Sequence, residues 1–97
     1  MAYDPGAIDA TLAAAVGDEP QLIAELREAF IDGVTRGVAA MKDADSPETW
    51  AGAALRLKGL AASFGAVRLM ALANEAAMAP EGDPQVIRKL QRTIERL

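Results

Sequence analysis

The sequence predicts an all-α fold: an antiparallel up-down-up-down four-helix bundle preceded by a short extra helix at the N-terminus. Apolar residues recur at spacings of three and four along alanine-rich segments, and no segment alternates with the period of two that marks a half-buried strand. Short connections marked by Asp-Pro, Ser-Pro and glycine separate these segments, which favours antiparallel neighbours. With no repeat and no linker in 97 residues, we expect residues 1–97 to form one domain.

Two helices are expected in the first half of the chain. A short one covers residues 4–17, between an Asp-Pro start and a glycine stop, and its apolar positions are Ile8, Leu12 and Val16. The second begins at Asp18, the expected N-cap, and reaches Met41. Within it, Gly33 and Gly37 each cost about 1 kcal/mol relative to alanine. We interpret these glycines as tolerated rather than as points of close helix packing.

Three helices are expected in the second half. One covers residues 47–64, with Ser46 as its N-cap and a glycine after its end. The next covers residues 66–78, and its expected buried positions are Val67, Met70, Ala73, Ala76 and Ala77. The last begins after Asp83 and runs through residues 84–97, with an apolar face formed by Ile87, Leu90, Ile94 and Leu97.

The helix over residues 47–64 has two apolar faces. At about 100° per residue, the broad side that we assign to the core contains Trp50, Ala53, Leu57, Leu60, Ala61 and Phe64. Leu55 lies about 200° from Leu57, on the opposite side, and its neighbours one turn away are Ala51, Gly52, Lys58 and Gly59, with Glu48 and Ala62 a turn further out. A glycine on an exposed helix face weakens the helix, and close approach by a partner would explain it. The alternative interpretation is a lone exposed leucine, which is common on protein surfaces.

The composition excludes several classes of function. Without cysteine or histidine, the chain lacks disulfides, thiolate metal sites, cysteine nucleophiles and the commonest general base and metal ligand. The carboxylate pairs Glu25–Glu28 and Asp43–Asp45 are typical of solvated charge, and no phosphate-binding loop or serine nucleophile motif is present. We therefore expect no enzymatic activity, no cofactor and no metal site.

The net charge of −4 argues against nucleic acid or an anionic membrane as the main partner. The charge is uneven, because residues 1–50 hold 10 acids and 3 bases whereas residues 51–97 hold 4 acids and 7 bases. No apolar run approaches the roughly 20 residues of a membrane span, and the N-terminus lacks the pattern of a signal peptide. These features predict a cytoplasmic location.

Residues 54–66 read Ala-Leu-Arg-Leu-Lys-Gly-Leu-Ala-Ala-Ser-Phe-Gly-Ala. This segment resembles the signature of the histidine phosphotransfer (HPt) domains of bacterial phosphorelays, which is Ala-His-x-Leu-Lys-Gly, a few small residues, an apolar residue and Gly-Ala. The resemblance covers about residues 18–78 well and the last helix loosely. It implies a four-helix bundle whose active histidine projects from the middle of the helix that carries the signature.

In this sequence Leu55 occupies the position of that phosphoacceptor histidine. Leucine has no lone pair, and the chain has no other histidine, so phosphotransfer is excluded on chemical grounds. Lys58 matches the family's lysine beside the phosphohistidine, and Gly59 matches the glycine that lets a receiver domain come close. Leu60 departs from the pattern, since a small polar residue is frequent there.

The resemblance implies a pseudo-HPt module that binds the receiver domain of a response regulator, or a histidine kinase, without phosphotransfer. The residues expected to contact the partner are Ala51, Gly52, Leu55, Arg56, Lys58, Gly59, Ala62 and Arg68. The three basic residues in this set would orient an acidic receiver pocket. Two alternatives remain: a structural bundle that forms a homodimer through the Leu55 patch, and a phosphotransfer domain whose histidine has been substituted by leucine.

Overall fold

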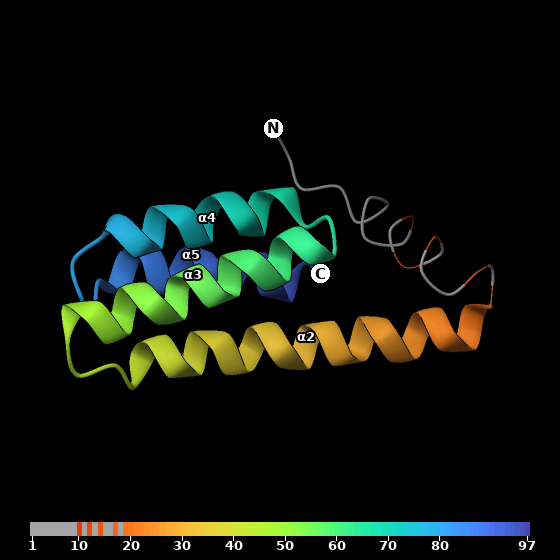
Figure 1. The fold of residues 1–97 in the computed structure, drawn as a ribbon, viewed down its shortest axis with the longest axis horizontal. Coiled ribbons are helices and arrows are strands. Elements are labelled where there is room, and N and C mark those ends of the chain that lie inside the picture. The colour runs from red at the N-terminus through yellow and green to blue at the C-terminus, as the bar shows by residue number, and fades with distance from the viewer. Residues whose placement is uncertain (1–9, 11, 13, 15–16, 18) are drawn as a thin grey trace.

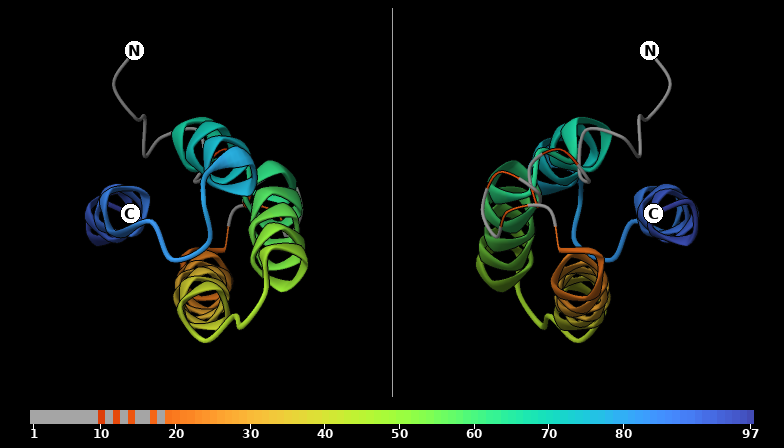
Figure 2. Two further views of the ribbon diagram at one scale, coloured as in Figure 1. Left: turned by 90° about the vertical axis from the view of Figure 1, so that its left-hand side faces the viewer. Right: turned by 90° about the vertical axis from the view of Figure 1, so that its right-hand side faces the viewer.

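The computed structural model describes residues 10, 12, 14, 17 and 19–97. This part of the chain is all-helical and holds four helices, α2 (Pro20–Lys42), α3 (Pro47–Ser63), α4 (Val67–Met78) and α5 (Pro84–Glu95), and no strand. The helices lie lengthwise beside one another (Figure 1) and, viewed end-on, surround a common centre in the order α2, α3, α4, α5 (Figure 2). The predicted all-α fold is confirmed. The short helix expected over residues 4–17 falls mainly outside the described residues.

The starts of the helices follow the chemistry of N-capping. The hydroxyl of Ser46 accepts a hydrogen bond from the backbone N–H three residues later, at 3.1 Å, and the carboxylate of Asp83 accepts one from the N–H two residues later, at 2.9 Å. Both caps were predicted. The N-cap of α2 is Glu19 instead of Asp18, and its side chain makes no capping hydrogen bond. Pro20 follows at the first helical position, where the missing N–H has no intrahelical partner to lose.

A Schellman motif closes the turn between α3 and α4. The N–H of Ala66 donates to the carbonyl oxygen of Ala61 at 2.9 Å, and the N–H of Gly65 donates to that of Ala62 at 3.2 Å. Gly65 adopts a φ of 70°, a left-handed conformation that glycine reaches without the penalty of a Cβ atom. This glycine therefore ends α3 at Ser63, one residue before the predicted end, and sends the chain directly into α4.

The core lies between the four helices and is organised around Trp50 of α3. This side chain is buried, and its indole Nε1 donates a hydrogen bond to the carbonyl oxygen of Ala76 in α4 at 2.8 Å. Phe30 of α2 stacks on Phe64, with ring centroids 4.5 Å apart. Of the core face predicted for this helix, the buried members are Trp50, Ala53, Leu57 and Ala61, and the half-buried ones are Leu60 and Phe64.

Helix α4 turns most of the predicted face to the core, shifted so that Leu69 and Leu72 are included and Val67 is not. Val67, which was expected to be buried, is 63% exposed, whereas Leu69 and Leu72 are buried. The remaining predicted positions are the buried Ala73 and Ala76 and the half-buried Met70 and Ala77. The buried strip combines Leu69 and Leu72 with Ala73 and Ala76, and the two leucines remove more apolar surface from water than Val67 would. On α5, the buried residues are Val86, Ile87, Leu90 and Thr93, with Ile94 and Leu97 half-buried.

Helices α2 and α3 approach closely at two glycines. A Cβ atom on Gly37 would lie 3.2 Å from Cδ1 of Leu57, and one on Gly33 would lie 3.1 Å from Cδ2 of Leu60. These distances are shorter than the roughly 3.5–4.0 Å of favourable carbon–carbon contact. The interpretation of both glycines as merely tolerated is therefore wrong. Their missing side chains make room for two leucines of α3 against α2.

Gly59 and Gly37 offer a matched test of this packing. Gly59→Ala should raise the free energy of unfolding by about 1 kcal/mol, because alanine favours the helix and nothing lies within 4 Å of its new Cβ atom. Gly37→Ala gains the same helix propensity but presses against Leu57, where overpacking costs about 1–3 kcal/mol. Its net effect should be near zero or destabilising in urea unfolding followed by circular dichroism. Equal stabilisation by both substitutions would contradict the close approach.

Candidate functional site: an exposed surface on α3

Leu55 lies in the middle of α3, on the side that faces away from the core. It is 52% exposed, whereas its neighbours Ala54 and Leu57 are buried. The predicted orientation of this leucine is confirmed. Because half of its side chain remains in water, Leu55 contributes only about half of the roughly 1.5–3 kcal/mol that full burial of a leucine provides.

Small residues surround Leu55 and leave the surface around it open. Gly59, one turn later, has no atom within 4 Å of the position that a Cβ would take, and Ala62 is exposed. Ala51 and Gly52, one turn earlier, are half-buried. One half-exposed leucine therefore projects from a strip of small residues in the middle of α3. The Leu55 surface consists of Ala51, Gly52, Leu55, Lys58, Gly59 and Ala62.

Lys58 is the charged member of the Leu55 surface, and it is held in place. Its side chain is half-buried, and its ammonium Nζ donates a hydrogen bond to Oδ1 of Asn74 in α4 at 3.0 Å. This bond fixes a positive charge at the seam between α3 and α4, beside Leu55. Asn74 was not among the site residues predicted from the sequence. The available signal was that the only asparagine of the chain stands inside a helix, where asparagine is a poor helix former.

Arg56 borders the Leu55 surface on the side away from α4. The residue is exposed, and its Nη1 lies 3.7 Å from the position that a Cβ on Gly52 would take. The guanidinium therefore lies back over the preceding turn of α3. It adds positive charge to the edge of the surface.

Arg68 lies elsewhere. It precedes Glu75 by seven residues, so the two side chains share one face of α4. That face is directed toward α5, since Glu75 Oε1 pairs with Nζ of Lys89 at 3.3 Å. The structure therefore gathers seven of the eight predicted contact residues around Leu55 and leaves Arg68 on the α5 side of α4.

Two exposed apolar side chains of α4 were not predicted as contact residues. Met78, in the last turn, is 78% exposed, and Val67, in the first turn, is 63% exposed. Each stands at one end of the helix that packs beside the Leu55 surface. Both residues had been expected elsewhere, Val67 in the core and Met78 only as the end of the helix.

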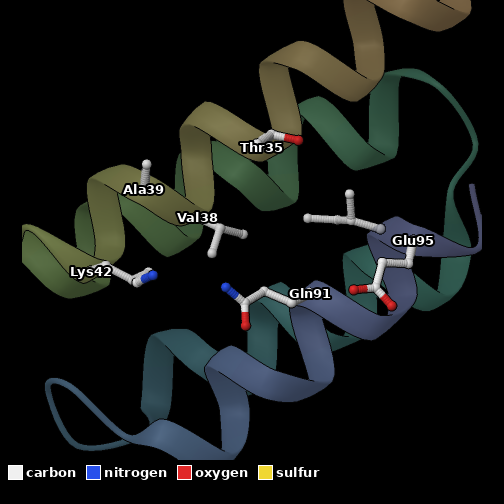
Figure 3. Close-up of a pocket in the computed structure, with 7 residues that line it drawn as sticks. Thr35, Val38, Ala39, Lys42, Gln91 and Glu95 are labelled. Atoms are coloured by element: carbon white, nitrogen blue, oxygen red, sulfur yellow. The ribbon is translucent and has the colours of Figure 1, made fainter.

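A groove between α2 and α5 is another candidate site (Figure 3). It has a volume of about 480 Å³ and is lined by Thr35, Val38, Ala39, Lys42, Gln91, Ile94 and Glu95. Its polar side chains are all exposed, and the hydroxyl of Thr35 already donates to the carbonyl oxygen of Ile31 at 2.8 Å. Lys42 and Glu95 place opposite charges along its length. Because no buried polar group points into the groove, we do not assign it as the functional site.

Within residues 19–97 and the four described positions before them, no three acidic side chains gather where they could hold a metal ion. No helix of this described part is long and apolar enough to cross a membrane. No protein-family model, curated protein or solved structure matches the chain. Function must therefore be argued from the residues and their geometry.

Proposed function

We propose that this chain is a pseudo-HPt module, a non-catalytic component of bacterial two-component signalling in the cytoplasm. It binds the receiver domain of a response regulator, or a histidine kinase, through the Leu55 surface and transfers no phosphoryl group. One observation supports this proposal: Leu55, at the position that the resemblance assigns to the phosphoacceptor histidine, is half-exposed beside a lysine and a glycine that match the motif.

The proposal includes an antiparallel up-down-up-down arrangement of the four helices. It is supported by the hydrogen bond from Trp50, in the first turns of α3, to Ala76, near the end of α4. The short Schellman turn between these two helices supports the same arrangement. In Figure 1 the colour along the chain runs from one end of the molecule to the other and back at successive connections.

Apolar contact and charge give the Leu55 surface two complementary roles in docking. The open space above Gly59 lets the backbone of a partner helix come close. Covering the exposed half of Leu55 would contribute on the order of 1 kcal/mol. Lys58 and Arg56 would attract the acidic phosphorylation pocket of a receiver, which raises the association rate and fixes the orientation of the complex.

With leucine at position 55, no phosphoryl group can be transferred to this position within the complex. Its side chain offers no lone pair, and the hydroxyl of Ser63, about two turns later on α3, donates to the carbonyl oxygen of Gly59 at 3.0 Å. A receiver bound here keeps its phosphoryl group and is withheld from competing phosphotransfer partners. The module therefore acts by occupancy.

The Leu55→Arg variant tests the docking role. The purified chain is titrated calorimetrically with each receiver domain and each histidine kinase of the source organism. One of them should bind the unmodified chain, and Leu55→Arg should weaken that binding at least about tenfold, equivalent to about 1.4 kcal/mol. The control is Leu22→Arg, at a 40% exposed leucine of α2, which should bind like the unmodified chain. Failure of every candidate to bind, or equal binding by Leu55→Arg, contradicts the proposal.

Sedimentation at several protein concentrations separates docking from self-association. The proposal expects a monomer, with the same sedimentation coefficient for the unmodified chain and for Leu55→Arg. A dimer that Leu55→Arg dissociates would assign the Leu55 surface to a homodimer interface instead.

The Leu55→His variant tests the resemblance that places leucine at the phosphoacceptor position. Incubated with the phosphorylated form of the receiver that binds, it should gain a phosphoryl group that is lost in acid and kept in base, as expected for a phosphoramidate. The unmodified chain should gain none. A Leu55→His variant that binds this receiver and remains unphosphorylated would contradict the assignment of position 55.

A further inference from the structure

The apolar side chain of Met78 is not buried in the core of the bundle. At 78% exposure it is the most exposed of the large hydrophobic residues in the described part of the chain, and it stands in the last turn of α4. Methionine is flexible and polarizable, properties that suit adaptable binding surfaces. Its position relative to the Leu55 surface decides whether it belongs to the same contact.

The hydrogen bond between Lys58 and Asn74 sets the register of α3 against α4. Leu55 precedes Lys58 by three residues, and Met78 follows Asn74 by four. Because the two helices run in opposite directions in the arrangement proposed above, both displacements point the same way. At 1.5 Å per residue, Leu55 and Met78 lie about one turn from the hydrogen bond, on the same side of it.

Both side chains also point outward from the seam between the two helices. Four residues turn a helix by about 40° beyond a full turn, and three residues fall about 60° short of one. Met78 and Leu55 are thus rotated only modestly from Asn74 and Lys58, and their exposure of 78% and 52% shows that the rotation is toward solvent. One apolar side chain therefore flanks the seam on each helix, with the lysine next to both.

One positive charge, that of Lys58, is held at this seam. Glu75, which follows Asn74 directly, is turned away and pairs with Lys89 of α5. Glu48 is also on α3, but it lies in the first turn, about two turns before Leu55. Lys58 is therefore the positive charge ordered at the seam, one turn from both apolar side chains, whereas Met78 also has Glu75 three residues before it and Glu81 three residues after it.

We propose that the docking surface crosses from α3 to α4, with Leu55 and Met78 as two apolar anchors and Lys58, positioned by Asn74, as the charge between them. This inference rests on the proposed function, and it commits to a receiver domain as the occupant. A carboxylate cluster bordered by apolar side chains complements one lysine flanked by two apolar anchors. Asn74 is a positioning residue, because it keeps the lysine side chain ordered before the partner arrives and so reduces the entropy lost on binding.

Substitution of Met78 tests the second anchor. For the receiver that binds the unmodified chain, Met78→Gln should raise the Kd about 3-fold or more, and Met78→Asp about 10-fold or more. Gln keeps the length of the side chain and adds no negative charge near the C-terminal end of α4, where an acid is unfavourable. The controls Leu22→Gln and Leu22→Asp alter another exposed apolar residue, on α2, and should leave the Kd unchanged. Circular dichroism confirms that each variant is folded.

The role of Asn74 is separated from a merely structural one by kinetics. Lys58→Met should lower the association rate constant and reduce its dependence on salt, since a steering charge is lost. Asn74→Ala keeps the charge, so the salt dependence should persist while dissociation becomes faster. The double variant should bind as Lys58→Met does, because Asn74 acts through Lys58. Additive losses in the double variant would overturn the positioning role.

The outcomes distinguish this inference from the function on which it rests. If Leu55→Arg abolishes binding and both Met78 variants bind like the unmodified chain, the second anchor is wrong and the proposed function stands. If no receiver binds the unmodified chain, the proposed function fails, and the inference fails with it.

Discussion

The orientation of α3, which determines which of its faces is buried, is the constraint on which the rest of the structure depends. The buried Trp50 donates its indole N–H to Ala76 of α4, and Leu57 and Leu60 lie against the glycines of α2. Turning Leu55 into the core would require a rotation of about 140° from the position of Trp50. That rotation would expose an aromatic side chain worth about 4–6 kcal/mol of burial, in exchange for covering half a leucine. The surface that carries Leu55 is therefore fixed by the packing of the opposite face.

The glycines of α2 lie against leucine side chains, whereas Gly59 of α3 faces open space. Gly33 and Gly37 are in tight contact with leucine side chains of α3, so the fold itself accounts for them. Gly59 has open space around its missing Cβ, yet it weakens α3 by about 1 kcal/mol relative to alanine. No contact in the described part of the chain compensates for this loss. Close approach by the proposed partner would account for this glycine.

The sequence predicted the parts of the fold that depend on local chemistry. Ser46 and Asp83 cap their helices as expected, because capping involves neighbouring residues, and the two faces of α3 follow from a strong contrast between Trp50 and the small residues opposite. The orientation of α4 was missed at Val67. In an alanine-rich helix several strips are similarly apolar, so periodicity alone does not decide which strip is buried.

Contacts between distant residues were beyond the reach of the sequence. The role of Gly37 requires knowing that Leu57 faces it, and the pairing of Lys58 with Asn74 joins residues sixteen positions apart on two helices. Seven of the eight predicted contact residues lie together because they share one helix, whereas Arg68 is on a second helix, and its distance from Leu55 depends on how α3 and α4 pack. The docking function remains a prediction from the residues, since a four-helix fold hosts many functions.

Mapping the contact by nuclear magnetic resonance tests the central claim most directly. The 15N-labelled chain would be titrated with the receiver domain that binds it, and changes in amide chemical shift would be followed residue by residue. The account predicts that the largest changes fall on the middle of α3, at Leu55, Gly59 and Ala62, and on the end of α4. Largest changes along the groove between α2 and α5, around Thr35 and Gln91, with α3 unaffected, would contradict it.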